Sequence, residues 1–152
     1  GVGTTRPEAI IFPAAGFSIV RSPGSQLLPM LLRGRFTSVT YGLDEIDLVY
    51  KRITHKNGGE DIIINETALL SYPFDSFFFV APDDKERAEL VEIGLKRAYA
   101  SGAFMEHFET FPPIQAGLAL MKKHNPQIFS IKNPDLSDKV QAIPAEYWHA
   151  FN

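Results

Sequence analysis

The residues best suited to chemistry lie at the start of the chain, where the sequence reads Gly3-Thr4-Thr5. The helix predicted to follow presents unpaired backbone N–H groups and the positive end of its dipole at this point. Threonine hydroxyls add hydrogen-bond donors, so an anion such as a carboxylate fits there. Ordinary helix capping by Thr4 or Thr5, with Glu8 reaching back as in a capping box, is the alternative explanation.

A second polar group is expected at the end of a strand predicted over residues 35–41. Tyr41 offers a ring face and a hydroxyl, and Gly42 and Glu45 follow it closely. Ligands of open parallel sheets bind at the carboxyl ends of the strands, where these residues would lie. Simple packing of the Tyr41 ring at the strand end is the alternative.

Arg21 and Ser22 follow another predicted strand, residues 17–20, and are candidate ligand-binding residues by the same topological argument. Their case is weaker than that of Tyr41. A solvated arginine without a ligand explains Arg21 better.

Enzymatic chemistry finds little support in the sequence. The histidines are far apart, and no HExxH, GxSxG or GxxxxGK[ST] motif occurs. The acidic pairs Asp44-Glu45 and Asp83-Asp84 stand at predicted helix starts, where they complement the dipole, and Asp44 is a predicted N-cap. We therefore expect no catalytic residue, no metal and no cofactor.

Composition narrows the classes of partner. The 152 residues carry a net charge of -3, and the sequence pI is about 5.8, which leaves no basic footprint for nucleic acid. No apolar run approaches the roughly 20 residues of a bilayer span, so direct membrane insertion is not expected. The first residues lack the basic and apolar regions of a signal peptide. The absence of cysteine excludes disulfides but leaves the compartment open.

Hydrophobic spacing and turn residues predict alternating helices and strands, typical of the α/β class. Short strands or extended segments are predicted at residues 1–3, 17–20, 35–41, 62–64, 67–71 and 77–80. Helices are predicted at about residues 6–15, 26–34, 44–52, 85–100, 104–108 and 114–124. Glycines at positions 16, 34 and 102 are placed to end helices. The core of the second region is predicted to contain Phe77, Phe78, Phe79, Phe104, Phe108 and Phe111.

Four phrases, in order, carry a resemblance to a known family. They are GRFTSVTYGLDEI, LLSYPFDSFFFVAPDD, ELVEIGLKRAYASGAFMEHF and IKNPDLS. Together the chain resembles the second half of a type 2 periplasmic solute-binding protein, the fold of extracytoplasmic amino-acid receptors of ABC transporters. The resemblance covers most of the chain.

This resemblance implies a two-lobed fold lacking its N-terminal half. Residues 1–64 would form the α/β lobe two, and residues 65–152 the return crossing with the C-terminal helices of lobe one. The implied function is periplasmic or extracytoplasmic binding of a small polar or anionic molecule, such as an amino acid, with a membrane permease as partner. The family position matching Gly3-Thr4-Thr5 contacts the acidic group of the ligand.

Two positions depart from the family pattern. Thr37 stands where relatives commonly carry aspartate, and Tyr41 where they carry arginine, so the case for an amino-acid ligand is weakened. A ligand-sensing or structural interaction module of a larger signalling protein is the alternative function. If half of lobe one is absent, apolar helix faces would be uncovered, and we expect the fragment to self-associate as a homo-oligomer.

Overall fold

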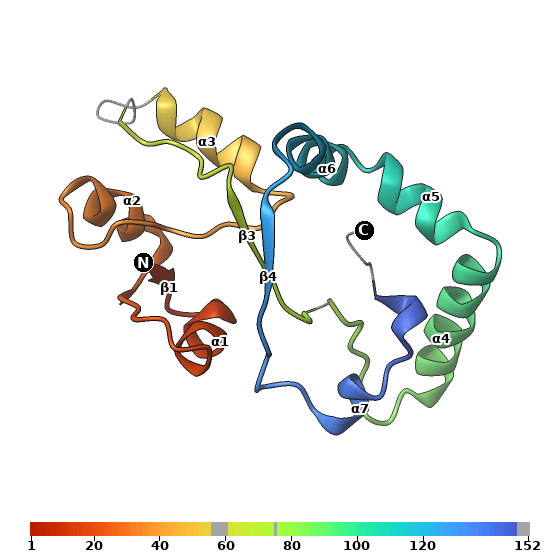
Figure 1. Ribbon diagram of the computed structural model, residues 1–152. Coiled ribbons are helices and arrows are strands. Elements are labelled where there is room, and N and C mark those ends of the chain that lie inside the picture. Colours follow the sequence, from red (N-terminus) through yellow and green to blue (C-terminus); the bar gives the residue numbers. More distant parts are fainter. Residues whose placement is uncertain (56–60, 75, 149–152) are drawn as a thin grey trace.

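The computed structural model describes residues 1–55, 61–74 and 76–148, and it has a mixed α/β architecture (Figure 1). The first part contains β1 (Val2–Gly3), α1 (Glu8–Ala14), β2 (Arg21–Ser22), α2 (Gly24–Leu32) and α3 (Ile46–Thr54). The second part contains β3 (Ala68–Ser71), α4 (Lys85–Ala100), α5 (Ala103–Thr110), α6 (Pro112–His124), β4 (Gln127–Ser130), α7 (Asp138–Gln141) and a 3-10 turn (Ala145–Tyr147). The mixed α/β class predicted from the sequence is therefore confirmed.

Both strand pairs are parallel, and each pair is joined through helices. β1 pairs with β2 across α1, with Val2 opposite Arg21 and Gly3 opposite Ser22. β3 pairs with β4 across α4 to α6. Parallel strands need such crossover connections because a tight turn reverses the chain direction.

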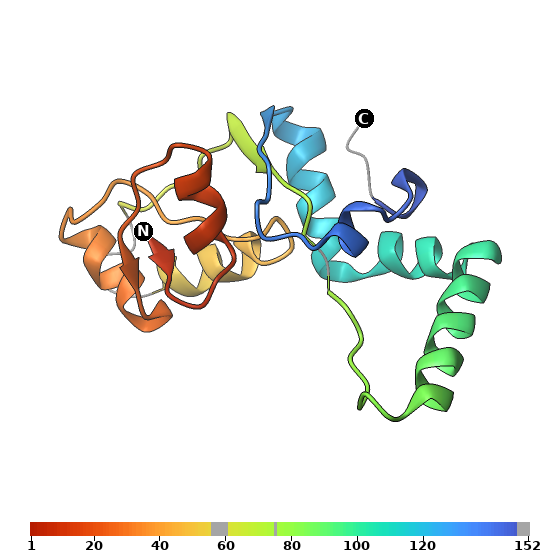
Figure 2. The ribbon, with the colours of Figure 1, turned by 90° about the horizontal axis from the view of Figure 1, so that it is seen from below.

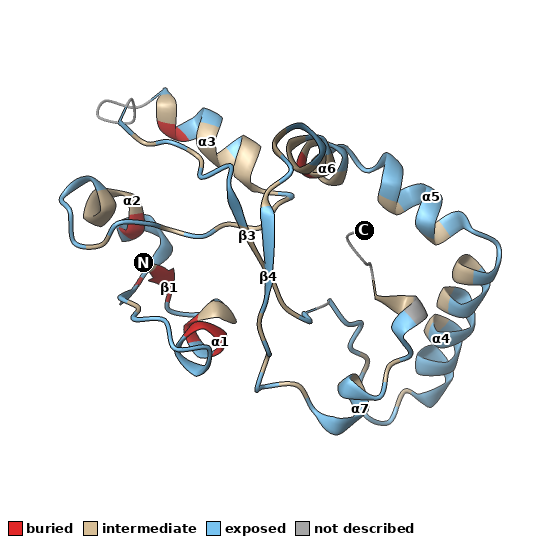
Figure 3. Cartoon of the chain, in the orientation of Figure 1, coloured by how far each residue is buried: buried red, intermediate tan, exposed pale blue. Residues whose placement is uncertain are grey.

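The hydrophobic core lies beside the first strand pair. Val2, Ala9, Ile11 and Phe12 form a buried cluster. Leu70, Tyr72 and Ile131, from the ends of β3 and β4, pack against it together with Ile19. The central strands therefore attach the C-terminal half to the N-terminal core. Figure 3 shows buried positions on β1 and α1, with further ones on α2, α3 and α6.

Helices α4 to α6 form an arc that leaves the N-terminal part of the molecule (Figures 1 and 2). The arc returns toward the N-terminal part at α6, where the buried Gly117 lies against the backbone of Leu43. A Cβ atom at Gly117 would stand 2.6 Å from the Leu43 carbonyl oxygen. Glycine is therefore required for this close approach between α6 and the chain that precedes α3.

Several predicted elements are confirmed with small shifts in their bounds. The helix predicted over residues 85–100 is α4, and the extended segment at residues 67–71 contains β3. Gly16, Gly34 and Gly102 follow helices with φ values of 87°, 66° and 79°, as expected of left-handed stops. β4 was not predicted from the sequence.

Two predicted strands and an extended run are not strands in the structure. Residues 17–20 precede a ladder of only two residues at Arg21–Ser22, because β1 offers no longer partner. Residues 35–41 form no ladder, and the Phe36 ring instead lies against Gly1. Residues 77–80 do not form a strand, and the exposed fractions of Phe78 and Phe79 are 72% and 91%.

The prediction that these phenylalanines build a core is therefore wrong for most of the set. Phe77 and Phe111 are exposed as well, and Phe104 and Phe108 are only partly buried. Apolar composition alone predicted burial, but burial needs a facing layer, and none covers these side chains in the part of the chain that the structure describes.

Candidate functional site

A small pocket next to β1 brings together residues from three segments of the chain. We call it the N-terminal pocket, and its volume is about 210 Å³. Its lining residues come from the end of β1 and the start of α1, from α2, and from the segment before α3: Val2, Gly3, Thr5, Arg6, Glu8, Gly24, Leu27, Thr40 and Tyr41. The pocket therefore combines a small apolar floor with hydroxyl, guanidinium and carboxylate groups.

Gly3, Thr5 and Tyr41, predicted as site residues from separate parts of the sequence, all line this pocket. Thr4 does not line it, and the Thr4 backbone N–H instead donates to the Ser22 carbonyl at 3.1 Å. Burial, and secondly the charge of Glu45, raise the pKa of Tyr41, so its hydroxyl stays protonated and can donate.

The expected capping roles of the first threonines are not found. Pro7 occupies the N-cap position of α1, and no side chain caps the helix. Thr5 is an exposed residue of the pocket lining, and its side chain makes no N-cap bond to the first helical turn. Asp44 likewise does not cap α3, because the N-cap position belongs to Glu45, which makes no side-chain cap bond.

An ion pair closes one side of the pocket. Arg6 Nη2 donates to Glu45 Oε2 at 2.9 Å, and this joins the approach to α1 with the start of α3. The hydrogen bond to Glu45 raises the pKa of the Arg6 guanidinium, which is therefore charged. A Cβ atom on Gly3 would lie 2.9 Å from Arg6 Cγ, so the glycine lets the arginine stem cross the strand.

Glu45 and Gly42, both predicted site residues, are neighbours of the pocket but do not line it. Glu45 acts on the pocket through Arg6. Gly42 leaves room for the Asp44 carboxylate, since a Cβ atom there would stand 2.5 Å from Asp44 Oδ1. Glu45 and Gly42 therefore support the residues around the pocket and do not contact its interior.

Arg21 and Ser22 have structural surroundings. Pro13 has no N–H to donate to the Ala9 carbonyl one helical turn earlier, and Arg21 Nη2 donates to that oxygen instead, at 2.6 Å. Ser22 is buried in β2 opposite Gly3. Neither residue lines the N-terminal pocket. The guanidinium of Arg21 replaces the backbone donor that Pro13 lacks.

Arg6 and Glu8 are the charged residues of the pocket lining, and sequence reasoning did not predict either of them as a site residue. Glu8 was expected to act as a capping-box carboxylate, yet its Oε1 accepts a hydrogen bond from the Tyr72 hydroxyl at 2.7 Å. Burial, followed by this hydrogen bond, raises the pKa of Tyr72. Glu8 and Tyr72 are far apart in sequence, and no local pattern indicates their contact.

A larger hollow of about 1500 Å³ lies within the arc of helices. Several of its lining residues are aromatic: Tyr72, Phe74, Tyr99, Phe104, Phe108, Tyr147 and Trp148. The charged lining residues are Asp44 and Lys132. With so few charged groups, the hollow offers an apolar surface but no focused set for recognition or catalysis.

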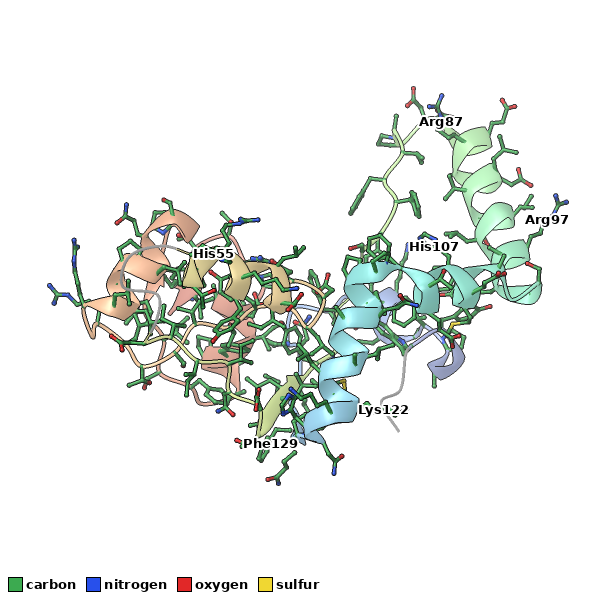
Figure 4. All side chains as sticks on the ribbon, turned by 90° about the horizontal axis from the view of Figure 1, so that it is seen from above. His55, Arg87, Arg97, His107, Lys122 and Phe129 are labelled. Atoms are coloured by element: carbon green, nitrogen blue, oxygen red, sulfur yellow. The ribbon has the colours of Figure 1, made fainter. Side chains whose placement is uncertain are left out.

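Histidines and acidic residues do not gather into a metal site within residues 1–55, 61–74 and 76–148. Figure 4 shows His55, directly after α3, and His107, on α5, in different parts of the molecule. In the same stretches of chain, no helix has the length and apolar character needed to cross a bilayer.

Comparisons with protein-family models, with characterised proteins and with solved structures find no match to this chain. The geometry of the N-terminal pocket is therefore the main basis for assigning a function.

Proposed function

We propose that this chain binds a small polar solute in the N-terminal pocket, as part of an extracytoplasmic receptor that serves an ABC transporter. The observation that carries the proposal is the meeting of Gly3, Thr5 and Tyr41 in one pocket. Gly3 and Thr5 come from one segment and Tyr41 from another, and the hydroxyls of Thr5 and Tyr41 are suited to binding a polar ligand. The proposed role is binding without turnover.

Arg6 compensates for the main departure from the family pattern, which is the absence of an arginine at position 41. Relatives of the proposed class commonly carry arginine where this chain has Tyr41, and Arg6 supplies a guanidinium to the same pocket from another position. Glu45 holds this group at 2.9 Å. A ligand carboxylate could replace Glu45 as its acceptor, because guanidinium binds carboxylates in a bidentate manner.

The order of elements supports the two-lobed class as part of this proposal. The parallel pairs β1–β2 and β3–β4 and the intervening helices agree with residues 1–64 as lobe two. Residues 65–152 would then be the return crossing and the C-terminal helices of lobe one. Closure of two such lobes around a solute is a known form of hinge motion, and the permease would sense it.

A thermal-shift screen of amino acids and small organic anions tests the proposal. A solute that binds the native state raises the melting temperature by mass action. Thr5→Val and Tyr41→Phe each remove one hydroxyl and are expected to weaken binding by about tenfold. Thr110→Val, on α5, is the matched control and should leave affinity unchanged. A folded chain that responds to no compound in the screen would count against the proposal.

A sensing or interaction module of a larger signalling protein is the second candidate function. The exposed aromatic side chains of residues 77–79 favour it, because such surfaces often contact other proteins. Fractionation of the native cells by osmotic shock separates the two candidates. A transport receptor is released with the extracytoplasmic fraction, whereas retention with the cytoplasm would favour the second candidate.

A further inference from the structure

Residues 77–80 form an uncovered apolar stretch between β3 and α4, with the sequence Phe-Phe-Phe-Val. Phe77, Phe78 and Phe79 are all exposed, and Val80 is partly buried. Figure 2 shows the stretch, in yellow-green, leaving the strand pairs and running out to the start of α4. The backbone of residues 77–80 makes no hydrogen bond to any residue in the described parts of the chain. Both its side chains and its backbone groups therefore lack partners within these parts.

The composition of this stretch is that of a β-strand. Phenylalanine and valine favour strands, and the stretch contains no charge, no proline and no glycine. An unpaired segment of this kind behaves like the open edge of a sheet, which readily pairs with another chain. Within the described residues, β3 and β4 pair only with each other, so neither of them covers residues 77–80.

We infer that residues 77–80 pair in an antiparallel manner with the same residues of a second copy of the chain. A two-fold interface joins the same surface of both copies, and antiparallel pairing of one segment with its copy has this symmetry. With Phe78 opposite Phe79 and Phe77 opposite Val80, every residue of the stretch is paired. This register sets aromatic rings across from each other, which stabilises paired strands. The inference does not depend on solute binding in the N-terminal pocket.

The area available in this stretch sets the strength of the dimer. The exposed parts of its three phenylalanines offer on the order of 300–500 Å² per copy. A standard interface buries roughly 800 Å² per partner, and smaller interfaces belong to weak complexes. Backbone hydrogen bonds between the two strands add to the contact. We therefore expect a weak and reversible dimer, which closes because each copy has one such stretch.

Sedimentation of the whole chain over a dilution series tests the inference. An equilibrium between monomer and dimer is expected, with no larger species. Phe79→Asp places like charges within the paired strands and should raise the dissociation constant of the dimer by at least about tenfold. Ile63→Asp, at a similarly exposed apolar position, is the matched control and should leave this constant unchanged. A monomer at every concentration, growth beyond the dimer, or equal effects of the two variants would each overturn the inference.

Thiol cross-linking tests the register by a separate measurement. The chain contains no cysteine, so an introduced thiol is unique. Since residue 78 would lie opposite residue 79 of the second copy, an oxidised mixture of Phe78→Cys and Phe79→Cys should give more disulfide-linked dimer than either variant alone. Both positions are exposed, so the variants should fold. Ile63→Cys is the control and should remain monomeric. A mixture that cross-links no more than the separate variants would overturn the proposed pairing.

Discussion

The two halves of the chain form their helices by different means. Every buried apolar residue in the described parts of the molecule lies within residues 1–55, and α4 and α5 contain no buried residue. Conversely, α1, α2 and α3 have no side-chain cap, whereas Asp84 caps α4 and Ser137 caps α7. Helices α5 and α6 have no side-chain cap either, but α5 follows the left-handed Gly102 and α6 begins at Pro112. Packing therefore specifies the N-terminal helices, and local hydrogen bonds and turn residues specify those that follow.

Further local signals occur along the C-terminal arc. Lys96 donates to Glu92 at 2.6 Å, one turn apart on α4. Gly102 and Asn125 adopt left-handed conformations next to helix ends, and Pro112 begins α6. Such signals fix where a helix begins and ends, but they do not bury its apolar face. The arc thus has well-defined helices and little core.

The largest expected effect is self-association of the chain through its exposed C-terminal half, which would sharpen the contrast between the two halves. We expect the chain to self-associate through the apolar face that includes Leu90, which is 64% exposed on α4, because apolar patches of this kind favour contacts. Light scattering over a dilution series should show a mass above that of the monomer, and Leu90→Lys should lower it. Leu48→Lys, at a similarly exposed leucine of α3, is the control from the other half. A monomer at every concentration would contradict the expectation.

Truncation of apolar side chains compares the two halves in free energy. Ile11 is fully buried, and Ile11→Ala should lower the free energy of unfolding by about 2–5 kcal/mol because it leaves a cavity. Leu90→Ala removes an exposed side chain, and its effect in the dilute chain should stay within about 0.5 kcal/mol. Urea unfolding at low protein concentration measures both. Similar losses in the two variants would show that α4 is covered in solution and that the contrast is wrong.

A matched pair of glycines tests the contact between Gly117 and Leu43, where the arc meets the N-terminal part. Gly117→Ala should cost about 1–3 kcal/mol, because its Cβ atom would press on the Leu43 carbonyl, which is backbone and yields little. Gly94, on α4, has open space around its position. Gly94→Ala should stabilise the chain by about 0.5–1 kcal/mol through helix propensity. Thermal unfolding compares the two, and a stabilising Gly117→Ala would contradict the contact.

The same contrast explains which elements could be predicted from the sequence. The bounds of α4 follow from Asp84 at its start and from Ser101 and Gly102 after its end, all of which are local signals. The strand predicted over residues 35–41 failed because an alternating pattern forms a strand only where a partner strand is available. β4 was missed because its partner, β3, is far away in sequence.

The candidate site was predictable to a similar degree. Gly3, Thr5 and Tyr41 stand out as turn and strand-end residues, and each lines the N-terminal pocket. Arg6 and Glu8 do not stand out, since the sequence offers a helix start as a sufficient explanation for them. Their partners, Glu45 and Tyr72, are brought to them by the tertiary fold, and no spacing in the sequence indicates either contact.

The smallest expected effect concerns the cap of α4. Asp84 Oδ1 accepts the backbone N–H of Arg87 at 3.1 Å, and α4 has no core to hold it if this bond is lost. Asp84→Ala should therefore cost about 1 kcal/mol, a typical value for loss of an N-cap, and should loosen the first turn of α4 in particular. Hydrogen exchange of the α4 amides measures this local loss, with Asp83→Ala as the neighbouring control. Helix α1 is buried and has no side-chain cap, so the protection of its amides should be insensitive to a change at Asp84. If Asp84→Ala lowered the protection of the α1 amides more than that of the α4 amides, packing and capping would not be divided between the two halves as we argue.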